Sequence, residues 1–528
     1  MLFRSHQSYG SFGVASGKWY AEVRVDDLGT NSTQIGVGSY IYPVSSANQN
    51  GNQSGITMVN LDNSSSSSRC VIIDGVAQTG SNSGFSFSAG DIIGVAMDID
   101  NDQVSFYKNN TLLGTGNHSL TTVGGGEFFL ILFTRGNFST GTLTANFGQD
   151  SSFAGNETPQ GNTDGNGVGD FYYAPPSGYL ALTTGNLPTA TITAPDEYFN
   201  TVLYAGDDTT SNAITGVGFQ PDFTWIKARN TGVLSHGLFD SVRGANKTLF
   251  SDVTNAENSA VVFPSFDSDG FTVSDAGGNW TNDSFNYVAW NWLAGGTAVS
   301  NTDGSITSQV SANTDAGFSV VGYTGNNTSG STIGHGLTSA PEMIIVKNRS
   351  QADKWAVYHA SNTSAPETDY LVLNDSVATA DATYWADTAP TSTVFSVGLT
   401  GPINQPSEDY IAYCFHSVEG YSKIGSYTGN GSTDGTFVHC GFRPAWVMVK
   451  RTDSANSWTL EDNIRDPHNP VDKYLLADQS DAEGTTLYFD FLSNGFKLRT
   501  LTGASNASGA TYIFIAFAEA PFKSANAR

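Results

Sequence analysis

The stretch PDFTWIK (221–227) sets the fold of most of this chain, because two variants of it follow, PEMIIVK (341–347) and PAWVMVK (444–450). Each begins with proline, continues with mostly apolar, β-branched and aromatic residues, and ends in lysine. Such residues favour a short buried strand. Proline cannot donate to a β-ladder and suits the first position of a strand. The lysine is expected to mark the point where the strand returns to water.

These strands belong to a longer pattern of five features that recur in constant order. An aromatic-Gly turn precedes each proline and begins at Tyr204, Tyr323 and Tyr427. The proline and the lysine come next. An apolar pair then leads to an aspartate: Asp252, Asp375 and Asp478. The last feature is an aromatic–β-branched–alanine–aromatic run: YVAW (287–290), YIAY (410–413) and FIAF (514–517).

The pattern predicts three copies of one antiparallel β-sandwich or jelly-roll-like module. The strands 222–227, 342–347 and 445–450 are expected in equivalent, central or near-central positions. The aromatic runs have large residues on both faces, which is typical of central strands buried on both sides. The repeated aspartate is interpreted as a turn residue that caps its own backbone.

The repeats divide the chain into five parts. We predict an N-terminal sandwich at 1–185, copy 1 at 186–296, a polar linker at 297–316, copy 2 at 317–418 and copy 3 at 419–528. Only HSVEG (416–420) separates the strands of copies 2 and 3, so these two modules are expected to pack tightly.

Composition excludes several classes of protein. The chain has 23 Lys+Arg against 49 Asp+Glu, and this net charge of −26 repels phosphate backbones, so no nucleic-acid partner is expected. Cys70, Cys414 and Cys440 have neither zinc-site nor disulfide-framework spacing, and Cys414 lies in an apolar, core-like run. The longest apolar run (512–518) is too short for membrane insertion, and the first residues lack a signal-peptide pattern.

The N-terminal third has the pattern of a separate all-β sandwich, with segments of strand length that end in Gly, Asn or Asp. Its motifs GKWY (17–20), IGVG (35–38), GDIIGVA (90–96), FYKN (106–109) and NFGQ (146–149) resemble the SPRY (B30.2) family in order and spacing.

The resemblance covers roughly residues 10–183. It implies a concanavalin-like sandwich of two antiparallel sheets that binds partners through its loops. The long polar loops at 41–68 and 76–88 are where such a partner is expected. Family members usually have an additional strand before the GKWY segment. Little chain precedes that segment here, so another element is expected to complete the first sheet.

An SPRY-like domain followed by stretches such as GHGLTSAPEMIIVKNRS (334–350) resembles structural proteins of bacteriophages, notably marine ones, that are assigned to tail fibres or other virion appendages. This resemblance implies a virion location, other virion proteins as partners, and a host-surface glycan or protein as target. A homo-oligomer is expected, with a trimer favoured, because appendages often have threefold symmetry. A capsid-decorating or head-fibre protein and a free glycan-binding lectin remain as alternatives.

Enzyme motifs are not found, and no catalytic activity or cofactor is expected. A glycosidase needs two carboxylates that face each other across the sugar, and the Glu-x-Asp-x-x-Glu strand of concanavalin-like glycosidases does not occur. EDNIRDPHNP (461–470) groups several titratable residues, but its prolines predict a solvated loop. Asp98, Asp100 and Asp102 have a calcium-like spacing without the Gly and distal Glu of an EF-hand. A hairpin turn is favoured there, and metal binding stays open.

One surface patch is predicted to bind a ligand. Trp280 has no counterpart in the other copies and lies among turn residues in GGNWTNDSF (277–285). With Asn279, Asn282 and Asp283 it is predicted to stack on a sugar ring and to hydrogen-bond its hydroxyls. The alternative is that Trp280 is buried under a loop. Trp385 is interpreted as a core residue.

Overall fold

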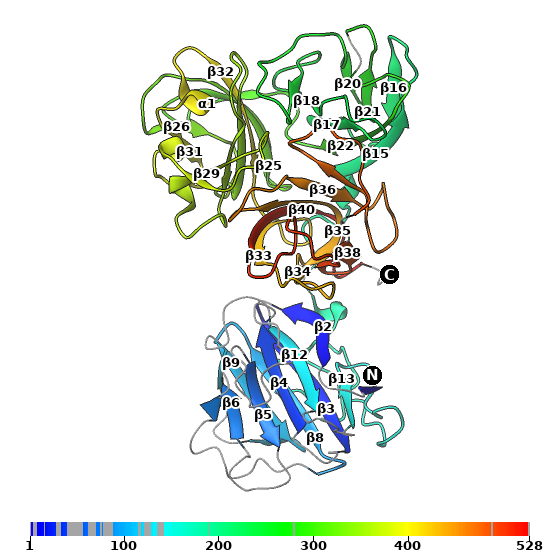
Figure 1. Cartoon of the computed structure of the whole chain (residues 1–528). Helices are drawn as coiled ribbons and strands as arrows, with labels where there is room; N and C mark the ends of the chain where they lie inside the picture. The colour runs from blue at the N-terminus through cyan, green and yellow to red at the C-terminus, as the bar shows by residue number, and fades with distance from the viewer. Residues whose placement is uncertain are drawn as a thin grey trace. The chain divides into compact units, whose positions relative to one another are not determined.

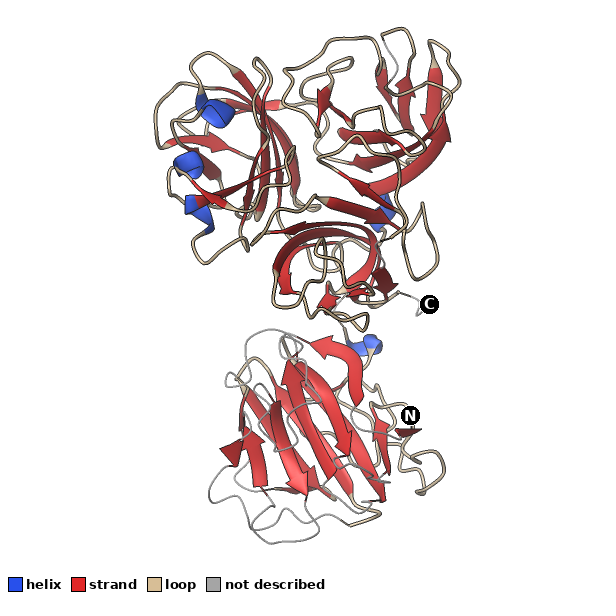
Figure 2. Cartoon of the chain, viewed as in Figure 1, coloured by secondary structure: helices blue, strands red, loops and turns tan. Residues whose placement is uncertain are grey.

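The computed structural model is built almost entirely from antiparallel sheets, which confirms the predicted all-β class (Figure 2). The described residues are 2–3, 8–14, 16–27, 33–39, 56–61, 70–73, 76–77, 88–113, 118–120, 128–134, 142–187, 189–277, 280–486 and 489–525. The chain forms two compact units, Met1–Pro188 and Thr189–Arg528. Within the described residues, no helix has the length and apolar character needed to cross a membrane.

The N-terminal unit is a sandwich of two sheets. Its strands are β1 (Leu2–Phe3), β2 (Ser8–Val14), β3 (Lys18–Asp27), β4 (Thr33–Ser39), β5 (Ile56–Leu61), β6 (Cys70–Ile73), β7 (Val76–Ala77), β8 (Ile92–Asp98), β9 (Gln103–Lys108), β10 (Thr111–Leu112), β11 (His118–Ser119), β12 (Phe128–Thr134), β13 (Thr142–Asn146) and β14 (Leu180–Ala181). One sheet has the order β1-β13-β3-β8-β9-β10, and the other has the order β2-β12-β4-β5-β6-β7.

Two strands, β1 and β2, precede the GKWY segment, so the expected shortage of strands before it is wrong. A late element also joins the first sheet, because β14 pairs with β3 in parallel at Trp19 and Tyr20. Glu22 of β3 helps to hold the chain that leads to β14. It is fully buried and accepts hydrogen bonds from the backbone N–H groups of Tyr172 and Tyr173 at 2.9 and 2.8 Å.

The C-terminal unit contains the three copies. Its strands are β15 (Phe199–Ala205), β16 (Asn212–Thr215), β17 (Phe223–Ala228), β18 (Gly237–Asp240), β19 (Leu249–Phe250), β20 (Ser265–Asp267), β21 (Gly270–Val273), β22 (Asn286–Trp292), β23 (Val299–Asn301), β24 (Ser308–Asn313), β25 (Phe318–Thr324), β26 (Ser331–Gly334), β27 (Met343–Asn348), β28 (Ala356–His359), β29 (Asp369–Val372), β30 (Ala380–Asp381), β31 (Val394–Val397), β32 (Asp409–Phe415), β33 (Ser422–Thr428), β34 (Phe437–His439), β35 (Phe442–Arg451), β36 (Thr459–Asp462), β37 (Tyr474–Leu476), β38 (Phe489–Leu492), β39 (Gly495–Leu498) and β40 (Thr511–Pro521). The helical turns among the described residues are η2 (Thr184–Asn186), η3 (Pro195–Glu197), η4 (Pro366–Thr368), η5 (Thr383–Trp385) and α1 (Gly401–Asn404).

Each copy is a sandwich with the same strand order in its larger sheet. The orders are β15-β22-β17-β18-β19, β25-β32-β27-β28-β29 and β33-β40-β35-β36-β37. The smaller sheets are β16-β21-β20, β26-β31 and β34-β39-β38. The three proline–lysine strands, β17, β27 and β35, are therefore equivalent, as predicted. The aromatic-run strands β22, β32 and β40 each lie between two neighbours, which confirms their central position.

The alignment of the third aromatic run is wrong by two residues. Tyr204 pairs with Tyr287, Tyr323 pairs with Tyr410, and Tyr427 pairs with Tyr512. The third run therefore begins at Tyr512, not at Phe514. Side chains alternate with a period of two along a strand, so a shift of two leaves each residue on its expected face and the sequence match looks equally good.

The segment predicted as a linker, 297–316, contains strands β23 and β24. Strand β24 pairs with β25 and extends the large sheet of copy 2 to the order β23-β24-β25-β32-β27-β28-β29-β30. The turn residues at 301–305 belong to the β23–β24 hairpin. Val310 of β24 is buried, whereas its neighbour Gln309 is exposed. The strand has a single large apolar residue, which is too weak a pattern to predict a strand.

Apolar residues from all three copies meet in one shared cluster. The three copies lie around a common centre in the C-terminal unit (Figure 1). Its ring contacts join copies 1 and 3 at Phe199–Phe517, copies 1 and 2 at Phe223–Tyr413, and copies 2 and 3 at Phe415–Phe517. A cavity of about 10 Å³ remains at this centre, which is room for about one water molecule. The copies thus share a close-packed core.

Candidate functional site

The described residues of the predicted ligand patch differ in how deeply they are buried. Trp280 is half-buried, and its ring lies edge-on to Phe250 with 5.1 Å between centroids. Asp283 is half-buried, and Asn279 lies outside the described residues. Asn282 is fully buried, so its assignment to a surface patch is wrong. Stacking of a sugar on Trp280 stays a prediction.

Asn282 instead fills a structural position that all three copies share. Its Nδ2 donates to Asp207 Oδ1 at 2.8 Å and to Thr209 O at 2.7 Å. The counterparts Asn404 and Asn506 accept hydrogen bonds from the backbone N–H groups of Asn326 and Asn430. This asparagine lies five or six residues before the tyrosine that begins each aromatic run. That recurrence is a sixth anchor, and the sequence alignment missed it.

The three aspartates at 98–102 contact three different partners. Asp98 forms an ion pair with Lys18 at 2.7 Å, and Asp100 accepts from the backbone N–H of Gly17 at 2.8 Å. Asp102 accepts from the hydroxyl of Ser119 at 2.6 Å. The segment is the hairpin turn between β8 and β9, as favoured. In the described part of the chain no group of His, Cys, Asp or Glu has a metal-binding arrangement.

The predicted partner loops of the SPRY-like sandwich, 41–68 and 76–88, lie largely outside the described residues. The two predictions about buried residues at Cys414 and Trp385 are confirmed, because both side chains are inaccessible to solvent.

The interpretation of 461–470 as a solvated loop is wrong for its first half. Glu461 and Asp462 end strand β36, and both are buried together with Arg465. The guanidinium of Arg465 pairs with Asp462 and also donates to the backbone carbonyl of Leu460 at 2.9 Å. Ile464 is already exposed, and most of the second half is exposed or half-buried, including His468. The prolines mark the end of the buried segment and say nothing about its start.

Glu461 is a buried carboxyl group whose burial is not offset by hydrogen bonds. Neither of its oxygens has a hydrogen-bond partner among the described residues. Burial raises its pKa well above the ordinary value; Arg465 acts against this shift, while Asp462, Asp472 and Asp466 add to it. Burial therefore favours the protonated form of this group in the folded chain.

We expect Glu461→Gln to flatten the pH dependence of stability. The folded-state pKa of Glu461 lies above its ordinary value of 4.5, so the folded chain holds a proton that the unfolded chain releases. The free energy of unfolding then falls as pH rises through this window, by up to about 1.4 kcal/mol per pH unit. Glutamine is neutral at every pH and removes the fall. Urea denaturation of both proteins between about pH 5 and about pH 8 measures the slope; parallel curves would contradict the assignment.

The lysine that ends each repeated strand is fully buried, which corrects the expectation that it returns to water. The three lysines are Lys227, Lys347 and Lys450. The ammonium of Lys347 donates to the backbone carbonyls of Asn348 at 2.7 Å, Gln351 at 3.3 Å and Thr254 at 3.1 Å. An ammonium has three donors and no acceptor, so these three carbonyls satisfy it completely. Burial lowers the pKa of each lysine to about 8.

One carbonyl of each lysine site belongs to a neighbouring copy, and these contacts close a ring. Lys347 of copy 2 reaches Thr254 of copy 1. Lys227 of copy 1 reaches Ser480 of copy 3 at 3.0 Å, and Lys450 of copy 3 reaches Ser376 of copy 2 at 3.0 Å. The three accepting residues are equivalent, since each lies two positions after the carboxylate or amide of the fourth anchor: Asp252, Asn374 and Asp478.

The fourth anchor therefore includes Asn374 and not the predicted Asp375. Asp375 does cap its own backbone as predicted, since its Oδ1 accepts the N–H of Val377 at 3.2 Å, but it lies one residue past the anchor position. The Oδ1 atoms of Asp252, Asn374 and Asp478 accept the backbone N–H groups of His236, Trp355 and Trp458, at 3.2, 2.8 and 3.0 Å. The anchor thus fixes the loop that offers a carbonyl to the neighbouring lysine.

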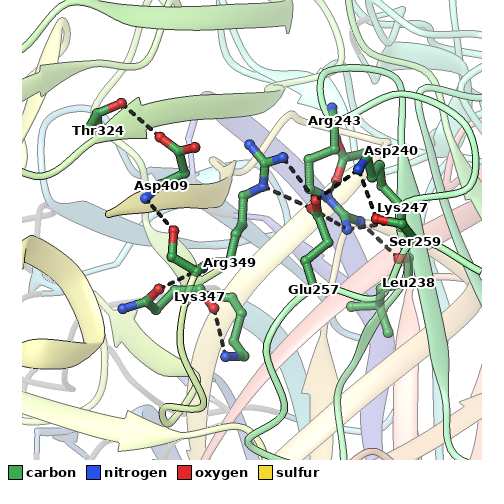
Figure 3. A network of polar contacts seen from close by, with 12 residues as sticks. Leu238, Asp240, Arg243, Lys247, Glu257, Ser259, Thr324, Lys347, Arg349 and Asp409 are labelled. Atoms are coloured by element: carbon green, nitrogen blue, oxygen red, sulfur yellow. Dashed lines mark hydrogen bonds and ion pairs between the residues drawn. The ribbon is translucent and has the colours of Figure 1, made fainter. Parts of the chain in front are cut away.

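Ion pairs reinforce two of the three interfaces. Arg349 of copy 2 forms a bidentate pair with Glu257 of copy 1, at 2.8 and 3.1 Å (Figure 3). Arg229 of copy 1 pairs in the same way with Glu483 of copy 3, at 2.9 and 3.1 Å. At the third interface, the backbone N–H of Thr379 donates to Thr452 O at 3.0 Å.

A second polar contact couples copies 1 and 2. Figure 3 shows Arg243 beside Asp240, and the two side chains form a fully buried ion pair. Asp240 also accepts from the phenol of Tyr413 at 2.8 Å. In copy 3 the equivalent Asp462 accepts from the indole N–H of Trp290 at 3.0 Å. The buried carboxylates of Asp240 and Asp462 therefore join copy 1 to copies 2 and 3.

The fold defines an all-β protein that joins an SPRY domain to a ring of three interlocked modules. The chain belongs to the family described as Domain of unknown function (DUF7483), whose model matches residues 194–521, a span that contains all three copies. The SPRY domain model matches residues 18–150. Among curated proteins, no relative is found.

Three solved structures similar to part of this chain are SPRY domains. The SPRY domain of human HERC1 has 20% sequence identity and a TM-score of 0.21, and the match covers 27% of this chain and 83% of that one. The TRIM65 PSpry domain has 17% identity and a TM-score of 0.20, with 27% and 71% covered. A human SPRY domain has 17% identity and a TM-score of 0.21, with 27% and 86% covered.

Proposed function

We propose that this chain is a bacteriophage virion structural protein of the tail-fibre or appendage type, which contributes to host-surface attachment by non-catalytic binding. The closed ring of three modules supports this role best. Its buried lysines and its buried or half-buried arginines bridge the copies, which makes the ring a rigid body. A part that transmits contact between a particle and a surface benefits from such rigidity, because a preorganised binding surface loses little entropy on binding.

The proposal includes partners of two kinds. Other virion proteins would hold the chain in the particle, and a glycan or protein of the host surface would be its target. A homotrimer belongs to the same proposal, and the ring already provides three equivalent modules around one centre within a single chain. A capsid-decorating or head-fibre role is the second candidate, because a rigid ring also suits a structural part of the capsid.

Immunogold electron microscopy tests this proposal. Antibodies raised against residues 189–528 would be applied to intact phage particles that encode the chain, with pre-immune serum as control. We expect gold at the tail or at another appendage, and pre-incubation of host cells with the purified protein should reduce adsorption of particles. Gold distributed over the capsid would overturn the appendage role in favour of the second candidate. Particles without gold would overturn the virion assignment.

A further inference from the structure

The first strand of each large sheet has the same position in all three copies, yet its outer edge is covered differently. In copy 2, β24 pairs along β25. In copy 3, the start of β33 is closed by its own connection, because Val418 and Ser422 form a bridge and the hydroxyl of Ser417 accepts from the N–H of Ile424. In copy 1, β22 is the one described strand that pairs with β15.

The hydrogen bonds between β15 and β22 show which backbone groups of β15 point away from β22. At one end of the ladder with β22, the N–H of Leu293 donates to the carbonyl of Tyr198. At the other end, the N–H of Gly206 donates to the carbonyl of Phe285. In an antiparallel pair, alternate residues bond to the same neighbour. The even-numbered residues of β15 therefore face β22, and the odd-numbered ones direct N–H and C=O away from it.

Two of these outward residues, Thr201 and Leu203, have backbone groups that no hydrogen bond from the described residues reaches. In copy 2 the equivalent residues are Val320 and Gly322, which pair with Ser311 and Gln309 of β24. Strand β24 of copy 2 thus shows how an added strand can bond to the backbone groups at this edge.

Side chains at the β15 edge are also left partly uncovered. Val202 is half-buried, whereas its counterpart Val321 in copy 2 is fully buried opposite Val310 of β24. Leu203 is 40% exposed. Strand β15 reads FNTVLYA, without the charge or proline by which proteins usually block an exposed edge.

We propose that the outer edge of β15 is a docking site for an extended strand of a partner protein, which adds antiparallel to it as β24 adds to β25. Strand addition uses backbone hydrogen bonds for affinity and alternate side chains for specificity. The β24 sequence SQVSAN defines the chemistry of the partner strand: no charge, an apolar residue opposite Val202, and uncharged polar residues on either side. A second copy of the chain is the poorer occupant, because each copy has a net charge of −26.

A labelled peptide of residues 299–313, which contains β23 and β24, tests this site on the full chain by fluorescence anisotropy. We expect saturable binding of one peptide per chain. Leu203→Pro removes an outward N–H and leaves the ladder to β22 intact, so it should weaken binding about tenfold. Ser426→Pro is the matched control at the equivalent, exposed position of β33, and it should leave the affinity unchanged.

Leu203→Lys serves as a second variant if Leu203→Pro does not fold, and the added charge at the edge should weaken binding similarly. Three results would overturn the proposal. They are the absence of saturable binding, equal affinity for wild type and both Leu203 variants, and a wild-type dimer in sedimentation that Leu203→Pro converts to a monomer. The last result would assign the edge to a second copy.

Discussion

Lys347→Met is expected to lower the free energy of unfolding of the C-terminal unit by about 3 kcal/mol. Methionine keeps much of the length of lysine but has no hydrogen-bond donor. The buried carbonyls of Asn348, Gln351 and Thr254 would therefore lose the donor that Lys347 provides. An unsatisfied buried acceptor costs about 1–3 kcal/mol. Lys227→Met and Lys450→Met should have similar effects, because their sites are built in the same way. Equilibrium urea denaturation of the three variants measures the loss.

Lys354→Met is the matched control, because this lysine is exposed on the same copy. Its effect should stay within about 0.5 kcal/mol, as is usual for surface substitutions. A loss at Lys347 no larger than at Lys354 would mean that the buried ammonium is not needed between copies 1 and 2.

An isolated copy 2, residues 296–418, is expected not to fold. Within the unit, one face of its large sheet packs against copies 1 and 3 through residues such as Phe318, Met343 and Trp355. Excision would expose this face to water, and full exposure of each large apolar side chain costs about 1.5–3 kcal/mol. The free energy of unfolding of a native domain is only about 5–15 kcal/mol, so the exposure of several such side chains would exceed it.

Near-ultraviolet circular dichroism and NMR of the excised copy measure this outcome, with residues 189–528 as the folded control. We expect little signal from ordered aromatic residues in the excised copy. A dispersed NMR spectrum typical of a folded monomer would contradict the shared core.

The strands and the repeats could be predicted from sequence because their causes are local. β-branched and aromatic runs favour strands, and the anchors within each copy have nearly equal spacing. The register of the third aromatic run could not be settled, since a shift from Tyr512 to Phe514 leaves every side chain on the same face of the sheet. The β23–β24 hairpin was hidden because its strands have few apolar residues.

The lysine sites could not be predicted, because their acceptors are distant in sequence. The carbonyls that receive Lys227 and Lys347 from neighbouring copies lie 253 and 93 residues away, and a single lysine at a strand end is normally exposed. For the same reason Asn282 was assigned to the surface, although its partner Asp207 lies 75 residues earlier. Buried polar groups depend on tertiary contacts, which a local pattern does not contain.

Scanning calorimetry of residues 189–528 tests most directly the claim that the three copies form one interlocked ring. A single shared core and equivalent contacts at all three interfaces predict one unfolding transition with equal calorimetric and van't Hoff enthalpies. Two or three separable transitions, or a calorimetric enthalpy well above the van't Hoff value, would show that the copies unfold independently and would contradict the ring.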